Sequence, residues 1–282
     1  MDFSFSPEQE DLRREARAFL EATPSPTMDQ LAGLGWTGML RGGDFSFLDA
    51  AVLFEELGRV LYDGPFVLSE IAGQPDDDVW SIEIDGFVPH LDRVDRVLRP
   101  DMTGTTAAGE VLATVDQTLG LGRLSPNGVE PAAGGWDDVR RKLLVAFALE
   151  AVGIGSKALE LGIAYVSERE QFGRRIGSYQ AISHSLVDGY VGVELARSLA
   201  YWAAWCVAEG DEQAELAAVS AKAHAGEAAV GACERSIQVH GGTGFTWEHP
   251  LHRYYKRALW LEGALGYGRE QRAEVAASLL RS

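Results

Sequence analysis

Two glycine-bearing segments in the second half of the chain combine residue types that can hold an anion. The first covers residues 168–184 and reads EREQFGRRIGSYQAISH. Its arginines, Arg169, Arg174 and Arg175, carry guanidinium groups suited to bidentate contact with phosphate, and its glycines allow a tight turn. Read by itself, the pattern is also typical of a loop between two helices whose arginines are solvated.

The second segment covers residues 238–250 and reads QVHGGTGFTWEHP. Its closely spaced glycines expose backbone N–H groups that can cradle an anion. Because no predicted strand precedes them, they do not form a dinucleotide-binding fingerprint. A metal site at His240, His249 and His252 is disfavoured, since the segment supplies no Asp or Cys partner. We interpret these histidines as hydrogen-bonded structural residues.

The elements that position both segments are predicted to be long helices. Amphipathic runs at about 138–168, 179–209, 212–240 and 250–280 predict an up-and-down bundle across residues 136–282. The two glycine-bearing segments fall at breaks between these runs. We therefore expect both of them at the ends of bundle helices.

The chain before the bundle divides into two further regions. Residues 1–64 predict short helices, one starting at Ser6 as N-cap with Gln9 reaching back, and another over residues 48–61. Residues 65–135 predict short strands, among them the alternating run that begins at Trp80 and meets an Asp85-Gly86 turn. This β region is small enough that we expect it to lean on the surrounding helices.

Taken together, the motifs resemble the acyl-CoA dehydrogenase family. Glu-Arg-x-Gln-Phe-Gly at 168–173, Ile-Gly-x-x-Gln-Ala-Ile at 176–182 and Gln-x-x-Gly-Gly-x-Gly-Phe-Thr at 238–246 follow one another as in that family. The resemblance is strong over residues 137–280. It implies a mainly α fold with a short N-terminal helical region, a reduced middle β domain and a C-terminal four-helix bundle. It also implies FAD, oxidation of acyl-CoA thioesters to 2-enoyl-CoA, and electron-transfer flavoprotein as acceptor.

The resemblance assigns roles to five residues. Glu262, in the Glu262-Gly263 step, stands where the family has its general base, although a solvated helix glutamate is the other interpretation. Family members contact the FAD of a neighbouring subunit through the motif at 168–173 and the motif at 238–246. The matching positions here are Arg169, Phe172, Gln238 and Gly242.

The chain departs from the family in its own flavin site. The middle-domain segment Thr-Glu-Pro-x-x-Gly-Ser is absent, and the family's Glu-Gly-Thr-x-Gln reads Glu-Gly-Ala-Leu-Gly at 262–266. Contacts to a partner's FAD are therefore kept while contacts to an own FAD are lost. The pattern resembles the shortened subunit of a bacterial heteromeric acyl-CoA dehydrogenase, some of which act on steroid side-chain thioesters. A homologous full-length subunit would then hold the FAD.

Other functions remain open from the sequence. One is a homomeric FAD acyl-CoA dehydrogenase with Glu262 as base, and another is a non-catalytic scaffold subunit. A flavin monooxygenase on the same fold is disfavoured by the presence of Glu262.

Composition excludes several classes of partner. The 282-residue chain has 42 acidic and 25 basic residues and a formal charge of −17, so phosphate backbones and anionic membrane surfaces repel it. Its two cysteines lack CxxC spacing, which gives no zinc or redox signature. The sequence shows no signal-peptide pattern at Met1 and no 18-residue apolar run. We therefore expect a cytoplasmic protein.

Overall fold

The computed structural model describes residues 5–42, 45–125 and 127–280. Its N-terminal helices are α1 (Pro7–Ala22), α2 (Met28–Gly33), α3 (Met39–Gly42), α4 (Phe47–Arg59) and α5 (Phe66–Ala72). The predicted start of α1 is confirmed, because Ser6 Oγ accepts from the Gln9 main-chain N–H while the Gln9 side chain accepts from that of Ser6. Helix α5 lies in a segment for which the sequence predicted only strands.

The described strands between α5 and the bundle form two small sheets beside the helices. The larger has the order β1 (Trp80–Ile82), β2 (Arg96–Leu98), β3 (Thr103–Thr106) and β6 (Glu130–Pro131), with β1 and β2 parallel and the others antiparallel. The smaller pairs β4 (Gly109–Val111) with β5 (Gly122–Leu124). A short 3₁₀ helix, η1 (Leu91–Arg93), precedes β2.

The predicted turn at Asp85 and Gly86 is confirmed. Both residues have positive φ, 52° and 81°, which is the signature of a type I′ hairpin turn, and Ile84 and Phe87 exchange two main-chain hydrogen bonds across it. The side chains of Trp80 and Ile82 are buried in the core that the helices form. The β region therefore leans on the helices, as predicted.

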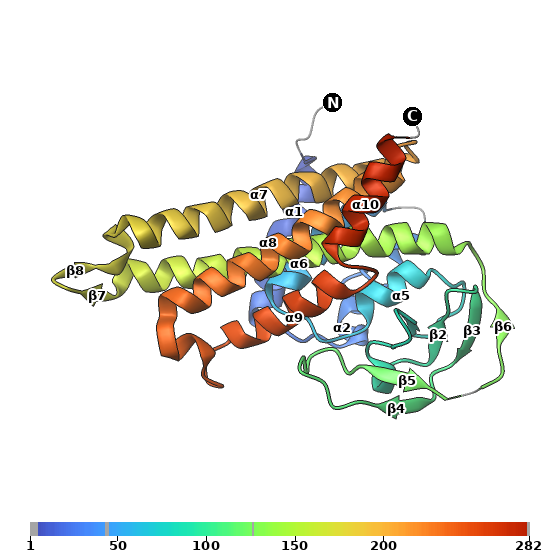
Figure 1. Cartoon of the computed structure of the whole chain (residues 1–282). Coiled ribbons are helices and arrows are strands. Elements are labelled where there is room, and N and C mark those ends of the chain that lie inside the picture. Colours follow the sequence, from blue (N-terminus) through green and yellow to red (C-terminus); the bar gives the residue numbers. More distant parts are fainter. Residues whose placement is uncertain (1–4, 43–44, 126, 281–282) are drawn as a thin grey trace.

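The C-terminal half is the bundle. Helices α6 (Trp136–Glu168), α7 (Gln180–Glu209) and α8 (Ala214–His240) run side by side along its length (Figure 1). The predicted single helix over 250–280 is wrong, because the chain forms α9 (Leu251–Gly263) and α10 (Gly268–Leu279). Between them Leu265 and Gly266 have φ values of 61° and 99°, which a right-handed helix cannot contain.

Helix α4 joins the N-terminal region to the bundle by close backbone packing against α6. A side-chain carbon on Gly58 would collide with the main chain of Glu150, and one on Gly153 would collide with that of Glu55. Because glycine has no side-chain carbon, these two positions let the backbones of α4 and α6 come closer together than a larger residue at either position would allow.

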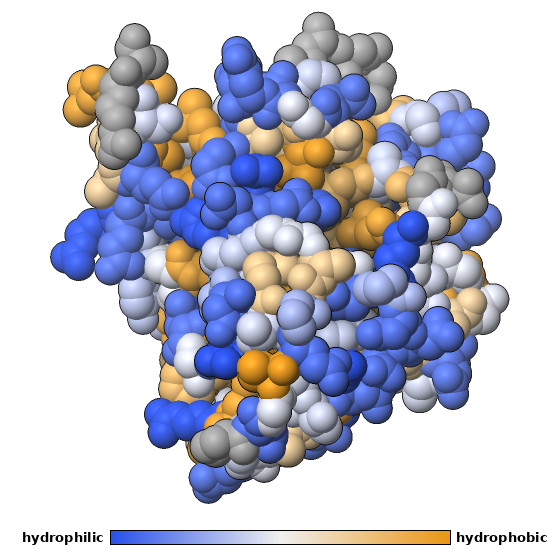
Figure 2. All heavy atoms as spheres, turned by 90° about the vertical axis from the view of Figure 1, so that its right-hand side faces the viewer, coloured by the Kyte–Doolittle hydropathy of each residue, from blue (hydrophilic) through white to orange (hydrophobic). Residues whose placement is uncertain are grey.

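The surface at the strand-bearing end is mostly hydrophilic. Figure 2 looks onto that end and shows hydrophilic side chains with smaller hydrophobic groups between them. Among the described helices, none has the length and apolar character needed to cross a bilayer.

Candidate functional site

A hairpin at the end of α6 carries two of the predicted residues. Its strands are β7 (Glu170–Gln171) and β8 (Arg174–Arg175), and it projects from the end of the bundle (Figure 1). Phe172 and Gly173 form the turn with φ values of 54° and 79°. The Phe172 side chain is 93% exposed. A large aromatic group at a hairpin tip loses water contact only when another surface covers it.

Arg169 lies at the base of this hairpin, with its main chain fixed and its side chain exposed. Its N–H donates to Tyr165 at 2.9 Å, and its carbonyl accepts from Ile176 at 2.8 Å. The Arg174 guanidinium instead covers the ring of Tyr179 at 3.8 Å. Within the described ranges no carboxylate pairs with the Arg169 side chain. The side chain is therefore open to an external anion.

The second motif lies at the same end of the bundle. Gln238 is exposed on the last turn of α8, and Gly242 is exposed in the 3₁₀ helix η3 (Gly241–Phe245) that follows. A carbon added at Gly242 would meet nothing within 4 Å. The ring of Tyr165, near the end of α6, stacks on that of His240 with centroids 4.2 Å apart. This contact holds the two motifs at one end of the molecule.

Two aromatic residues beside the second motif were missed by the sequence interpretation. Phe245 is 66% exposed and Trp247 is 72% exposed. Lys256 places its ammonium 4.4 Å from the Trp247 ring centroid. In the sequence, Phe245 and Trp247 directly follow the glycine run that ends α8. The residues around them have neither helical nor strand periodicity, so no predicted element would bury these two side chains, and that is the signal that could have identified them.

The histidines have structural hydrogen bonds, as interpreted. His240 Nδ1 lies 2.7 Å from the Ser236 carbonyl, and His249 Nδ1 accepts from the Leu251 N–H at 3.3 Å. Burial, followed by the neighbouring His240, lowers the pKa of His249. Across residues 5–42, 45–125 and 127–280, no three His, Cys, Asp or Glu side chains converge on a possible metal position.

Glu262 lies elsewhere, on the side of α9 that faces α8. Its Cα is 3.0 Å from the position of a carbon added to Gly226, and its main-chain oxygen accepts from Lys222 Nζ at 3.3 Å. Burial, followed by the charge of Glu227, raises the pKa of Glu262. Gly226 and Gln238 are about 18 Å apart along α8. The structure therefore brings the four predicted FAD contacts to one end and places Glu262 away from them.

The segment after Glu262 is closed by this chain's own contacts. The Leu265 N–H donates to Asp85 Oδ2 at 2.9 Å, and the Gly266 N–H donates to the Gly263 carbonyl at 3.1 Å. A carbon on Gly263 would lie 3.2 Å from the Tyr267 ring. Since its main-chain donors are taken and its side chains offer no hydroxyl or amide, this segment does not fit an FAD held by this chain.

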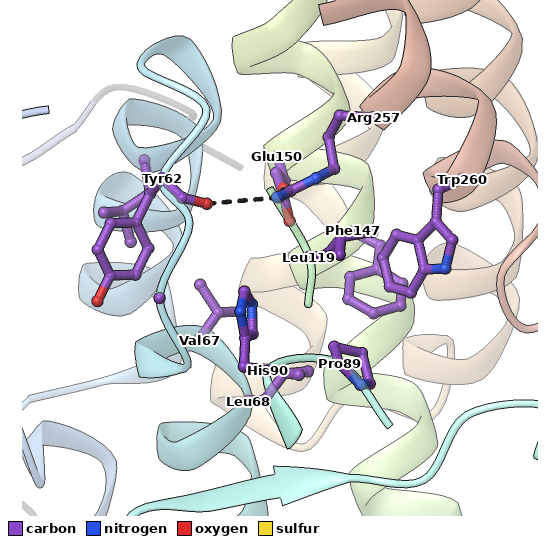
Figure 3. A pocket seen from close by; sticks show the side chains of 12 residues that line it. Tyr62, Val67, Leu68, Pro89, His90, Leu119, Phe147, Glu150, Arg257 and Trp260 are labelled. Atoms are coloured by element: carbon purple, nitrogen blue, oxygen red, sulfur yellow. Dashed lines mark hydrogen bonds and ion pairs between the residues drawn. The ribbon is translucent and has the colours of Figure 1, made fainter. Parts of the chain in front are cut away.

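The enclosed cavity nearest to α9 is too small for a substrate (Figure 3). It has a volume of about 20 Å³ and is lined on one side by apolar side chains, among them Leu68, Phe147 and Trp260, and on another by Glu150 and Arg257. Ligand pockets usually have about 300–1,000 Å³, whereas this space fits roughly one water molecule. An open cleft of about 360 Å³ lies outside it, between Phe87 and Tyr267, and Glu262 does not line that cleft.

A buried ionic network forms one wall of the cavity. Arg257, 2% exposed, donates from Nε to Asp116 at 2.8 Å, from Nη1 to Glu150 at 2.5 Å and from Nη2 to Thr118 Oγ1 at 2.5 Å. Burial raises the pKa of Glu150, and Arg257 opposes that rise. Because each of the three guanidinium nitrogens of Arg257 already donates to an acceptor of this chain, we interpret the network as structural. The sequence signal for it was Glu150 interrupting an apolar run of α6.

Comparisons with known proteins agree with the motifs. Residues 135–280 match the family model "Acyl-CoA dehydrogenase, C-terminal domain". Acyl-CoA dehydrogenase IpdE2 of Mycobacterium tuberculosis is 33% identical over 243 residues, which cover 78% of this chain and 74% of that protein.

Two solved structures share the fold. The ChsE4-ChsE5 complex from Mycobacterium tuberculosis contains a chain with a TM-score of 0.88 and 23% identity, and the match covers 100% of both chains. The Tcur3481-Tcur3483 steroid ACAD, in its G363A variant, gives a TM-score of 0.81 and 23% identity over 97% of this chain and 98% of the other. The predicted fold, mainly α with a small β region and C-terminal helices, is confirmed.

Proposed function

Because the chain belongs to the acyl-CoA dehydrogenase family, we propose that it is the shortened subunit of a heteromeric member of that family. The assembly would oxidise acyl-CoA to 2-enoyl-CoA, with a homologous full-length subunit holding FAD. The observation that carries the proposal is the shared location and exposure of Arg169, Phe172, Gln238 and Gly242. The side chains of Arg169, Phe172 and Gln238 and the backbone at Gly242 are all exposed at one end of the bundle.

These four residues fit a flavin that approaches from outside. The Arg169 guanidinium would pair with the pyrophosphate, because arginine binds phosphate oxygens through two parallel hydrogen bonds. The Phe172 ring would cover part of the cofactor and exclude water from it. Gln238 supplies an amide for hydrogen bonding, and the open backbone at Gly242 admits the adenine end. FAD itself supplies the acceptor for the hydride that leaves the substrate.

The geometry around Glu262 in this chain supports a model in which the other subunit binds the flavin and the acyl chain. The segment at 262–266 is closed by Asp85, and the enclosed cavity of about 20 Å³ cannot take an acyl chain. The full-length subunit would therefore provide the acyl pocket. The steroid ACAD among the structural neighbours supports steroid side-chain thioesters as the substrate class. We assign electron-transfer flavoprotein as acceptor on family grounds.

The test is flavin stoichiometry. The chain is purified alone and together with a homologous full-length acyl-CoA dehydrogenase from the same organism, and flavin absorbance per chain is compared. We expect no flavin in the lone chain and about one FAD per pair of different subunits. One FAD per chain in the lone protein would overturn the proposal.

A homomeric enzyme with Glu262 as base is the second candidate. The observation that favours it is the raised pKa of Glu262, since a base with a pKa nearer the working pH transfers protons more efficiently. It requires the lone chain to bind flavin, so the same measurement separates the two candidates. Flavin-free complexes with full-length subunits would instead favour a non-catalytic scaffold.

A further inference from the structure

Three histidines lie where the second motif connects α8 to α9. Tyr165 of α6 stacks on His240 of α8 with ring centroids 4.2 Å apart, and His240 contacts His249 with centroids 4.4 Å apart. His252, on α9, packs at a steep angle against Trp247 with centroids 5.0 Å apart. His240 and His252 are buried, and His249 is partly buried. These rings therefore line the junction of α6, α8 and α9.

The hydrogen bonds of His249 and His252 require neutral rings. Nδ1 of His249 accepts from the Leu251 N–H at 3.3 Å, so it cannot carry a proton of its own. Nε2 of His252 donates to the Trp247 carbonyl at 3.3 Å, and its buried Nδ1 has no hydrogen-bond partner in the described part of the chain. A proton on that nitrogen would be buried without an acceptor, which is costly.

The surroundings of His249 also oppose a positive charge. Its ring stands at the N-terminal end of α9, where the helix dipole disfavours a cation. Burial, followed by the neighbouring His240 and His252, lowers the pKa of His249. The titratable and charged groups that the adjoining elements place at this junction are Tyr165 on α6, His240 on α8, His252, Arg253 and Lys256 on α9, and Glu248 beside His249 in the chain.

The loop over residues 241–250 packs on this cluster. A side-chain carbon on Gly244 would lie 3.0 Å from Cβ of His240. Inside the loop, main-chain hydrogen bonds of 3.1 and 3.2 Å each close a single turn. Exposed segments with such local bonds open at a small cost in free energy. The bond from the Leu251 N–H to the His249 ring therefore matters for holding the loop against α9.

We propose that His249, set between His240 and His252, is a pH-sensitive latch, which holds the loop closed when its ring is neutral and releases the loop when it gains a proton. The proton removes the acceptor of the Leu251 N–H and sets a positive charge beside His240. Because the loop includes Gly242, its opening also weakens flavin retention, a consequence that rests on the proposed function.

The direction of the pH effect follows from linkage. In the open loop His249 has an ordinary pKa of about 6.5, whereas in the closed loop it takes up a proton only at lower pH. The closed loop is therefore fully stable above pH 6.5 and loses stability as the pH falls below that value. Between pH 7.5 and pH 5.5 the equilibrium shifts toward the open loop by about tenfold.

Hydrogen exchange of the lone chain, followed by mass spectrometry at pH 7.5 and pH 5.5, tests the latch. We expect the protection of the amides at 243–251, corrected for their intrinsic rates, to be about tenfold lower at pH 5.5. The protection of α7 should stay unchanged, which separates local opening from global unfolding. Unchanged protection of the loop, or an equal loss in α7, would overturn the proposal.

His249→Asn identifies the titrating group. The asparagine oxygen can replace the imidazole Nδ1 as acceptor for the Leu251 N–H, and it does not titrate. We expect this variant to keep its loop protection at pH 5.5. His184→Asn is the matched control, because His184 is exposed on α7, and it should lose loop protection as the wild type does. Equal losses in His249→Asn and the wild type would rule out the latch.

Flavin release from the complex with the full-length subunit tests the consequence for the cofactor. Release followed by flavin fluorescence should be up to about tenfold faster at pH 5.5 than at pH 7.5 for the wild type, and His249→Asn should remove that acceleration. Loop opening without faster release would confirm the latch and overturn its link to flavin. A complex without FAD at either pH would overturn the proposed function alone, since the exchange measurements on the lone chain do not involve flavin.

Discussion

Lys222 Nζ lies 3.3 Å from the main-chain oxygen of Glu262. The ammonium of α8 therefore stands at the C-terminal end of α9, where helix carbonyls lack partners and a cation is favourable. The bond fixes the main chain of Glu262 against α8, beside Gly226. A general base has to reach a substrate carbon, whereas this arrangement holds Glu262 on the helix-packing side of α9.

Replacing Glu262 by Gln tests whether this residue is the base. If the chemistry takes place mainly in the full-length subunit, we expect Glu262→Gln to reduce kcat of the reconstituted pair by less than tenfold. Loss of a true general base costs about 10²–10⁴ in rate. Steady-state oxidation of an acyl-CoA by the reconstituted pair measures the difference, and a hundredfold loss would return Glu262 to the catalytic role.

The buried Lys222 predicts a distinct pH dependence of stability. Burial lowers the pKa of Lys222 to about 8, so between pH 8 and the unfolded value of about 10.4 the folded state binds fewer protons than the unfolded state. The free energy of unfolding therefore rises with pH across that window. Burial of the charged Lys222 side chain destabilises the fold most below pH 8. In Lys222→Met that rise is absent.

Urea unfolding at several pH values measures this effect. We expect the stability of Lys222→Met relative to the wild type to fall by up to about 3 kcal/mol between pH 7 and pH 10.5. Groups shared by both proteins cancel in the difference. A difference that stays constant with pH would mean that Lys222 keeps its ordinary pKa in the folded protein.

Arg169 should determine how firmly the assembly retains flavin. A hydrogen bond between charged groups contributes about 1.5–3 kcal/mol, so Arg169→Ala should weaken FAD binding by the complex about 10- to 100-fold. Arg174→Ala is the matched control, because it removes the same charge from the same hairpin and its guanidinium lies over Tyr179. Flavin release followed by fluorescence distinguishes the two variants, and equal release rates would contradict the intersubunit contact.

The sequence predicted α1, α4 and the three long bundle helices well because their signals are local, whereas the short helix α5 was not predicted. The capping residues at Ser6 and Gln9 and the long amphipathic runs determined α1, α6, α7 and α8 with small errors at their ends. The break between α9 and α10 was missed, since Leu265 adopts its positive φ where its N–H binds Asp85, 180 residues away in sequence. Such a tertiary contact leaves no periodic signal.

Only those residues of the candidate site that belong to a sequence motif could be predicted. The exposed positions of Arg169, Phe172, Gln238 and Gly242 follow from motifs at helix ends, which the sequence located correctly. The direction in which Glu262 faces depends on Gly226 of another helix. The network around Arg257 depends on Asp116 in the β region and Glu150 in α6, which no spacing rule connects.

Removing Arg257 alone should strongly lower the free energy of unfolding, because its buried partners lose their counter-charge. Arg257→Met removes the cation that pairs with Glu150 and Asp116 and leaves two buried carboxylates together. Breaking a buried ion pair in this way costs about 3–5 kcal/mol, which thermal or urea denaturation will detect as a large destabilisation.

A second substitution separates the effect of the uncompensated charges from the effect of lost packing. Adding Glu150→Gln to Arg257→Met removes one of the uncompensated charges, so we expect the double variant to be more stable than Arg257→Met alone. Urea unfolding of the wild type, both single variants and the double variant completes a thermodynamic cycle. Strictly additive losses would show that Arg257 stabilises the protein through packing, and that its charge contributes little.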